Sequence, residues 1–239
     1  VDGWGGGLHN AIVIPYVLNY GSEDQKKRLL PKLISGELIG AIAMSEPAAG
    51  SDLQGVRTSA TKEGNQYVLS GQKTFITNGQ LANLVITVAK TNHKEDARGT
   101  SLFLIETDEV EGFRRGRNLD KIGMKSNDTS ELFYDNVKVP ASALLGPEEG
   151  QGFYQLMGEL PQERLLIAIY AIARIDRAIG VTLDYVKERK AFGKSISEYQ
   201  NTQFELAECK TEATIGKVFV DYCINEHLNG ICAYLCEFK

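Results

Sequence analysis

The spacing of apolar residues changes twice along this chain. Up to residue 37 they recur every three or four positions, as on one face of a helix. From Leu38 to about Pro140 the period falls to two, which is typical of half-buried strands, and after Pro140 the helical spacing returns. The order helix, strand, helix predicts an α+β fold with three parts: residues 1–37, 38–148 and 149–239.

Two helices are expected before the first strand. Ser22 and Gln25 form a capping box at the start of the second, because the serine hydroxyl can accept from the third amide while the glutamine reaches back. Gly36 supplies a glycine where that helix should end.

Seven runs in the middle part have the composition of strands, and turn clusters rather than helices lie between them. These runs are 39–44, 56–61, 67–70, 74–77, 84–89, 101–106 and 131–139. Strands that follow strands indicate an antiparallel β-barrel or sandwich. No glycine-rich dinucleotide fingerprint follows a strand, which argues against a Rossmann site.

After Pro140 the pattern predicts a C-terminal helical bundle. Pro161 is expected in a first helical turn, where proline is tolerated. One helix is predicted over 165–181 and on toward Lys190. Another carries Phe204 and later apolar residues, and the chain ends inside an apparent further helix.

Composition and charge exclude several functional classes. The 239 residues are 43% apolar and carry a net charge of −5 with no basic block, which argues against nucleic acid as a partner. No apolar run is long enough for a transmembrane segment. Four late cysteines without a CxxC pair and three scattered histidines predict no metal site, and they favour reduced thiols.

The turn after the first predicted strand carries the candidate chemistry. Ser45, Glu46, Pro47 and residues 50–52 (Gly-Ser-Asp) form a small polar turn that can aim amides and hydroxyls at a ligand, although most such turns are only turns. The run Ala-Met-Ser-Glu-Pro-x-x-Gly-Ser-Asp at 43–52 resembles the flavin-binding signature of the acyl-CoA dehydrogenases.

Three further segments match this family in its order along the chain. They are 72–79 (QKTFITNG), 188–194 (ERKAFGK) followed by Gln200, and 160–165 (LPQERL), of which the last is most similar to the long-chain subgroup. The resemblance covers nearly the whole chain. It also implies that further helices of the family, before Val1 and after Lys239, are missing from this fragment and that its activity alone is not assured.

The resemblance implies FAD as the cofactor and assigns residues to it. Met44 and Ser45 would bond the pyrimidine edge of the flavin. Phe75 would pack on the ring, Thr77 would bond a ring nitrogen, and Ile76 lies between them. Taken alone, Phe75 is better explained as a core aromatic residue.

A second set of cofactor and substrate residues follows from the same resemblance. Ser51 would contact the cofactor or the acyl-CoA, and Tyr154 would lie near the acyl-CoA. Arg189 would neutralise the FAD pyrophosphate of a neighbouring subunit, with Phe192 and Gln200 contacting the rest of that cofactor. Taken alone, Arg189 is better explained as a solvated helix end.

Breaking a C–H bond beside a thioester carbonyl requires a positioned base, and a carboxylate with a pKa near ~4.3 needs burial to serve. Glu163 has leucine-rich flanks, and Arg164 could orient its charge. The alternatives are that Glu163 belongs to a polar first turn, or that Glu159 is the base. The resemblance places the base at Glu163, with Pro161, Gln162 and Arg164 in the substrate site.

The implied function is FAD-dependent α,β-dehydrogenation of acyl-CoA thioesters in fatty acid β-oxidation, with long or branched chains favoured. Electrons would pass to an electron-transfer flavoprotein, and the intact protein would be a homotetramer, a dimer of dimers. The compartment would be the mitochondrial matrix in a eukaryote or the cytoplasm in a bacterium, and no targeting segment is recognised. Two alternatives remain: an inactive relative that serves in binding or assembly, and an acyl-CoA oxidase-like enzyme.

Overall fold

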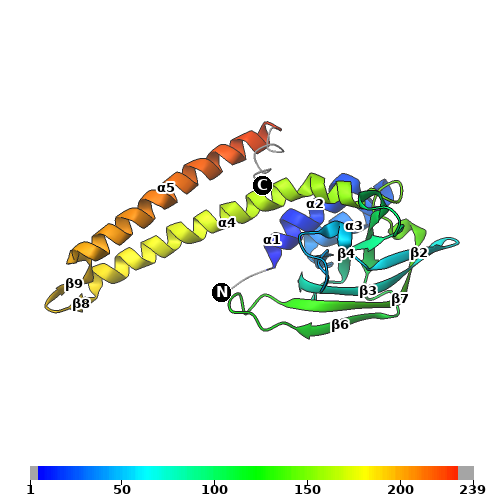
Figure 1. The fold of residues 1–239 in the computed structure, drawn as a ribbon, viewed down its shortest axis with the longest axis horizontal. Helices are drawn as coiled ribbons and strands as arrows, with labels where there is room; N and C mark the ends of the chain where they lie inside the picture. Colours follow the sequence, from blue (N-terminus) through cyan, green and yellow to red (C-terminus); the bar gives the residue numbers. More distant parts are fainter. Residues whose placement is uncertain (1–4, 231–239) are drawn as a thin grey trace. The chain divides into compact units, whose positions relative to one another are not determined.

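The computed structural model describes residues 5–230 and divides the chain into two compact units (Figure 1). We call Val1–Glu159 the sheet unit and Leu160–Lys239 the helical unit. The helix α4 (Gly152–Glu188) contains the boundary between them.

The sheet unit begins with helices, as predicted. A short α1 (Gly6–Leu8), a wider turn at His9–Val13 and α2 (Ile14–Tyr20) follow one another directly, and α3 (Glu23–Ser35) comes next. The capping box is confirmed, because Gln25 N donates to Ser22 Oγ over 3.2 Å and Ser22 N donates to Gln25 Oε1 over 2.8 Å. Gly36 ends α3 in the left-handed conformation at φ 78°.

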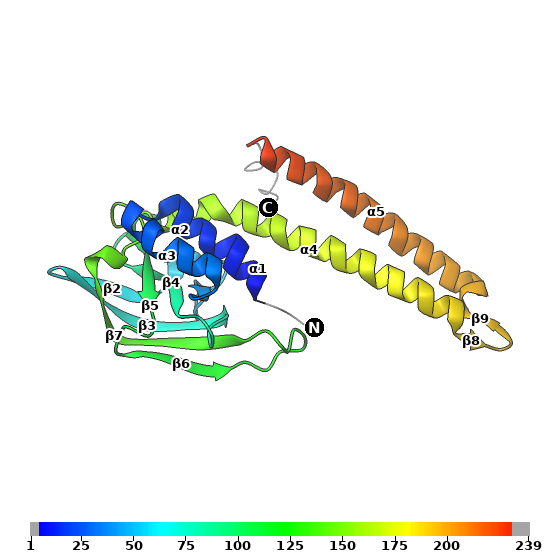
Figure 2. The same cartoon turned by 180° about the vertical axis from the view of Figure 1, so that it is seen from behind.

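The helices precede a curled sheet of seven strands, which are visible with α2 and α3 in Figure 2. The strands are β1 (Gly40–Ala43), β2 (Ser59–Glu63), β3 (Gln66–Thr77), β4 (Leu84–Lys90), β5 (Thr100–Glu106), β6 (Phe113–Asn118) and β7 (Thr129–Pro140). Their order is β1-β4-β2-β3-β7-β6, and β5 pairs with β4. Most pairs are antiparallel, but β4 runs parallel to β1 and, at one residue pair, to β2, so the sheet is mixed.

Two details of the sheet differ from the expected strands. The runs 67–70 and 74–77 are one strand, β3, which shifts its register against β7 after Leu69 and again after Lys73. The strand β6 was not predicted. Its sequence FRRGRN lacks an apolar alternation, because β6 is an edge strand that pairs only with β7.

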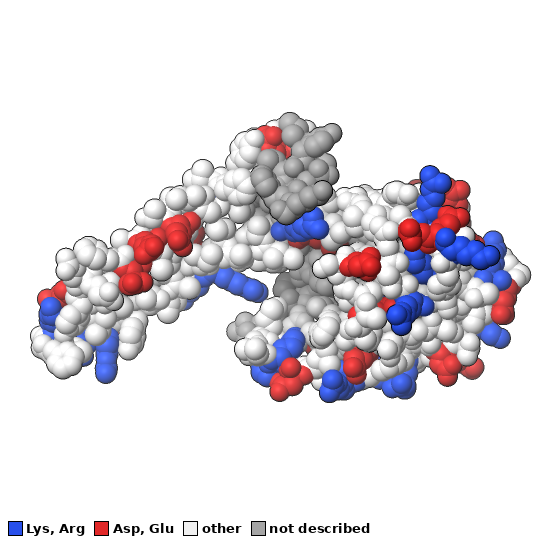
Figure 3. Space-filling model, viewed as in Figure 1, with Lys and Arg blue, Asp and Glu red and all other residues white. Residues whose placement is uncertain are grey.

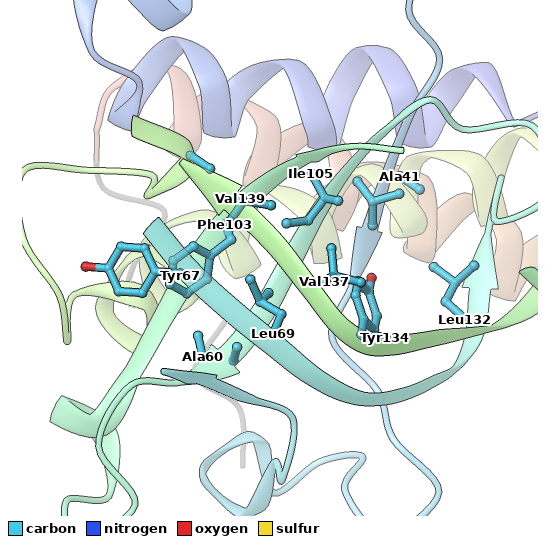
Figure 4. Close-up of a cluster of buried hydrophobic side chains, with 14 of the residues drawn as sticks. Ala41, Ala60, Tyr67, Leu69, Phe103, Ile105, Leu132, Tyr134, Val137 and Val139 are labelled. Carbon is cyan, nitrogen blue, oxygen red and sulfur yellow. The ribbon is translucent and has the colours of Figure 1, made fainter. Parts of the chain in front are cut away.

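Both faces of the central strand are covered. All seven residues of β4 are buried. Val85 and Ala89 join a cluster in which the Tyr67 and Phe103 rings meet edge to face at 4.9 Å (Figure 4). Leu84, Ile86 and Val88 join a second cluster formed with α2 and α3. Its helical members are Val13, Tyr16, Val17, Leu29 and Leu33.

The helical unit contains the rest of α4, a small hairpin of β8 (Lys190–Ala191) and β9 (Lys194–Ser195), and α5 (Gln200–Leu228). Pro161 lies inside α4, so its expected place in a first turn is wrong: the helix already starts at Gly152. Leu165 and Cys223 form a small buried hydrophobic cluster of this unit, and Val186, Ala213 and Val220 are also buried. The helix expected at the chain's end falls in 231–239, outside the described residues.

Candidate functional site

The loop after β1 is fastened to β3. Met44 and Ser45 are half-buried, and the Ser45 carbonyl accepts from Thr74 N over 2.9 Å. Asn78, which directly follows β3, donates from Nδ2 to the Gly40 carbonyl over 3.1 Å. These bonds bring Met44 and Ser45 beside the segment that contains Phe75, Ile76 and Thr77.

Phe75 is strained and exposed. It sits at the second register shift of β3 with φ 60°, a conformation that bulky residues rarely adopt, and its side chain is 70% exposed. Ile76 beside it is buried and Thr77 is half-buried. Phe75 is therefore not a core aromatic residue, and a strained, exposed ring of this kind is typical of a functional position.

Three hydroxyl groups of this loop and of β3 are available to a ligand. Within residues 5–230, the side chains of Ser45, Ser51 and Thr77 make no hydrogen bond. Ser51 is exposed in the turn that follows Ser45. An exposed aromatic ring together with the hydroxyls of Ser45 and Thr77 beside its strand fits a flavin, whose ring has apolar faces and a polar edge.

A buried ion pair that the sequence analysis missed lies under this loop. The Lys73 and Glu46 side chains are 0% and 5% exposed, and Nζ lies 2.8 Å from Oε1. Burial opposes the charged form of Glu46, but Lys73 and hydrogen bonds from Arg57 and Thr58 hold the pKa of Glu46 below its usual range. Burial lowers the pKa of Lys73 to about 8, against the attraction of Glu46.

The signal for this pair was present in the strand pattern. Tyr67 and Leu69 are buried alternate residues of β3, and continuing the alternation places Lys73 on the buried face. A lysine there requires a buried anionic partner. Glu46, in the adjacent turn, supplies it.

Glu163 is 9% exposed and lies eleven residues after the start of α4, so it is not part of a first turn. Pro161 and Gln162 are half-buried beside it, and Arg164 is exposed. Leu165, next along the helix, is buried. The structure therefore gives Glu163 the shielded setting that a base needs.

The competing carboxylate, Glu159, is already engaged in the sheet unit. Asn19 donates from Nδ2 to Glu159 Oε1 over 2.8 Å. Burial, together with the charge of Glu159, raises the pKa of Tyr20 to about 12. Tyr154, one turn earlier on α4, is half exposed.

The remaining predicted cofactor residues gather at the hairpin of the helical unit. Phe192 is 98% exposed at φ 50°, the second strained aromatic residue of this kind. Arg189 and Gln200 are exposed near it, and the Arg189 carbonyl accepts from Ile196 N over 2.9 Å. From Glu163 to its end at Glu188, α4 extends roughly 38 Å. Glu163 and the hairpin of the same protomer are therefore too far apart to contact the same small molecule.

Three further observations concern surface charge, metal ligands and membrane-spanning segments. Figure 3 shows acidic and basic side chains interspersed over one face of the sheet unit. In the part of the chain that the structure describes, no three potential ligands gather as a metal site would require. None of the helices within 5–230 combines the length and apolar character needed to cross a bilayer.

Three segments of the chain match known protein domains. Residues 3–37, 41–137 and 150–231 match, in order, the N-terminal, middle and C-terminal domains of acyl-CoA dehydrogenase. The chain belongs to the acyl-CoA dehydrogenase family. Among members of this family, the long-chain specific acyl-CoA dehydrogenase of Sus scrofa is 54% identical over 227 residues, which are 94% of this chain and 52% of that protein.

Solved structures of acyl-CoA dehydrogenases share the fold. That from Geobacillus kaustophilus is 50% identical with a TM-score of 0.93, covering 97% of this chain and 62% of that one. Butyryl-CoA dehydrogenase from Megasphaera elsdenii is 33% identical with a TM-score of 0.88, covering 95% and 60%. The chain thus spans about half the length of the Sus scrofa relative and three fifths of these structures.

Proposed function

We propose that this chain is part of an FAD-dependent enzyme that introduces an α,β double bond into acyl-CoA thioesters. The observation that carries the proposal is the burial of Glu163 in the interior of α4, at the position where the family resemblance expects the base. The similarity to a long-chain specific relative favours long acyl chains. The pathway would be fatty acid β-oxidation.

The chain's own residues would supply positioning and proton transfer. FAD, when bound, would supply the acceptor for the two electrons that leave with the β-hydrogen. Glu163 would take the α-proton onto its carboxylate, so that the products are the enoyl thioester and the reduced cofactor. Burial excludes water from this carboxylate, and Arg164 would restrain the charge from the neighbouring position.

The two exposed, strained aromatic residues support the cofactor assignment. Phe75 would pack on the flavin while Met44, Ser45 and Thr77 bond its polar edge. Phe192 belongs to a second set, with Arg189 and Gln200 at the hairpin of the helical unit. In the sheet unit, Ser51 and Tyr154 would lie toward the acyl-CoA. Because the hairpin lies roughly 38 Å along α4 from Glu163, it would serve the FAD of a neighbouring protomer in a homotetramer.

An electron-transfer flavoprotein would be the acceptor of the electrons. An oxidase-like enzyme would pass them to oxygen instead, and an inactive relative would bind without turnover. The compartment would be the mitochondrial matrix or, in a bacterium, the cytoplasm.

The test is anaerobic titration of the purified, FAD-loaded protein with saturated acyl-CoA of increasing chain length. We expect the visible flavin band to bleach, most readily with long chains. Glu163→Gln should keep its FAD and slow bleaching by about 10²–10⁴-fold, the usual contribution of a general base. Glu159→Gln is the matched control and should bleach normally.

Each alternative has its own signature in that titration. Bleaching that survives in Glu163→Gln but not in Glu159→Gln would move the base to Glu159. Flavin that no acyl-CoA bleaches would indicate the inactive relative. Peroxide formed in air at the rate of turnover would indicate an oxidase.

A further inference from the structure

The buried Lys73–Glu46 pair is poorly explained as a source of stability. Taking two charges out of water costs about as much free energy as their attraction returns, and apolar residues of similar size often do as well. The pair is nevertheless almost fully buried, at 0% and 5% side-chain exposure. We therefore consider which segments of the chain this pair connects.

The pair joins both ends of one loop to one strand. Lys73 Nζ donates to the Met44 carbonyl over 3.0 Å, at the start of the loop 44–58. Glu46 accepts from Arg57 N over 2.7 Å and from Thr58 N over 3.0 Å, at the loop's end. The loop is thus closed on itself by Glu46 and anchored to β3 by Lys73.

The anchoring point is also the point of strain. Lys73 is the last residue of β3 before the register shift that places Phe75 at φ 60°. Thr74, between them, donates from its amide to the Ser45 carbonyl over 2.9 Å. A phenylalanine in the left-handed conformation persists only where surrounding contacts stabilise it. The contacts of Lys73 and of the Thr74 amide, which precede Phe75 in the chain, supply this stabilisation.

We propose that Lys73 and Glu46 are positioning residues for the cofactor: together they hold the loop 44–58 against β3 so that Ser45 and Phe75 meet FAD in one arrangement. This inference rests on the proposed function. Neither side chain is exposed enough to touch the cofactor, so both act through the loop and through Phe75.

Lys90 provides a matched control. It is also a buried lysine of the same sheet, at 5% exposure, and it also anchors a loop, because Nζ donates to the Glu95 carbonyl over 3.1 Å. No candidate cofactor residue lies in the loop that it holds. Lys90→Met therefore reproduces the loss of a buried lysine without loosening Ser45 or Phe75.

The experiment compares Lys73→Met, the double variant Lys73→Met/Glu46→Gln, and Lys90→Met with the unchanged protein. The double variant leaves no unpaired buried charge, so its melting temperature should return close to the unchanged protein's even if Lys73→Met alone folds poorly. FAD affinity should still fall by about 10–100-fold in the double variant, by analogy with the range seen when residues that orient metal ligands are removed. Its visible flavin spectrum should shift as well, and Lys90→Met should retain both properties.

Hydrogen exchange without cofactor tests the positioning directly. The amides of Ser45 to Thr58 and of Thr74 should exchange faster in the double variant, while those of β5 remain unchanged. If the double variant recovers its melting temperature and binds FAD as tightly as the unchanged protein, the pair is structural only and the proposal is overturned. If the unchanged protein binds no FAD, the proposed function fails and takes this inference with it, whereas equal FAD binding by all variants overturns the inference alone.

Discussion

The sheet unit and the helical unit differ in how much of their apolar surface is covered. In the sheet unit both faces of β4 are buried and two extended clusters fill the space around it. In the helical unit the buried cluster consists of Leu165 and Cys223, with Ile169 and Ile224 packed against them. Its large exposed apolar residues include Ile167, Tyr185, Phe192, Phe204, Ile215, Val218, Phe219 and Leu228.

This difference shows where each unit obtains its order. The sheet unit holds its candidate site with its own core and hydrogen bonds. Apolar surface as extensive as that of α4 and α5 is characteristic of helices that pack against further protein surface. The proposed tetramer is one source of that surface, and the predictions below test the contrast between the units.

The largest expected effect comes from removing a buried ring. Phe103 is 0% exposed and packs edge to face on Tyr67, so Phe103→Ala should lower the free energy of unfolding of the sheet unit by about 3–5 kcal/mol. The matched change Phe204→Ala removes a ring that is 63% exposed on α5 and should change stability by less than about 0.5 kcal/mol. Urea unfolding with segment-resolved hydrogen exchange measures both. Equal losses would contradict the contrast.

The same contrast explains what the sequence could predict of the fold. Ser22 and Gly36 mark the ends of α3 because capping depends on residues adjacent in the chain. The prediction of a helix start at Pro161 was wrong because the apolar spacing of α4 begins earlier and continues through this proline. The parallel pairing of β1 with β4 was not predictable, since the alternation of a strand identifies its buried face but not its neighbour.

For the candidate site, the sequence indicated the burial of one residue but not the conformation of another. Glu163 could be placed in an apolar setting from its leucine neighbours, and its burial agrees. The conformation of Phe75 could not be read, because nothing local marks a phenylalanine that adopts φ 60°. The Glu46–Lys73 contact joins residues 27 apart and depends on the tertiary fold.

A smaller effect should appear in acid. The pKa of Glu46 is lowered in the folded state, so its stabilisation is complete above the ordinary value of 4.5 and is lost as the pH falls below that. The sheet unit should therefore lose stability between pH 7 and pH 3 through this carboxylate. Lys73 acts only on the alkaline side: between about pH 8 and 10.5 the unfolded chain holds more protons, so stability rises with pH.

Unfolding free energies measured from pH 7 to pH 3 check this dependence. Glu46→Gln should flatten the acid limb of the sheet unit. In the helical unit Asp176→Asn removes the partner of Lys210, a 3.3 Å pair whose side chains are 43% and 59% exposed, and should leave the acid limb unchanged. An acid limb that persists in Glu46→Gln would assign it to other carboxylates.

The smallest effect compares two capping boxes, one in each unit. Ser22 caps the 13-residue α3, whose Gln25 also donates to the Ser142 and Leu144 carbonyls over 2.8 and 3.0 Å, so Ser22→Ala should cost about 1 kcal/mol. Ser195 forms the same box with Glu198 around a three-residue turn at the exposed hairpin, and Ser195→Ala should lower the melting temperature less. A cap stabilises only as much structure as depends on the helix that it starts, and α3 carries Leu29 and Leu33 into the sheet core. If Ser195→Ala lowers the melting temperature more than Ser22→Ala does, the hairpin contributes to stability even though Phe192 is exposed.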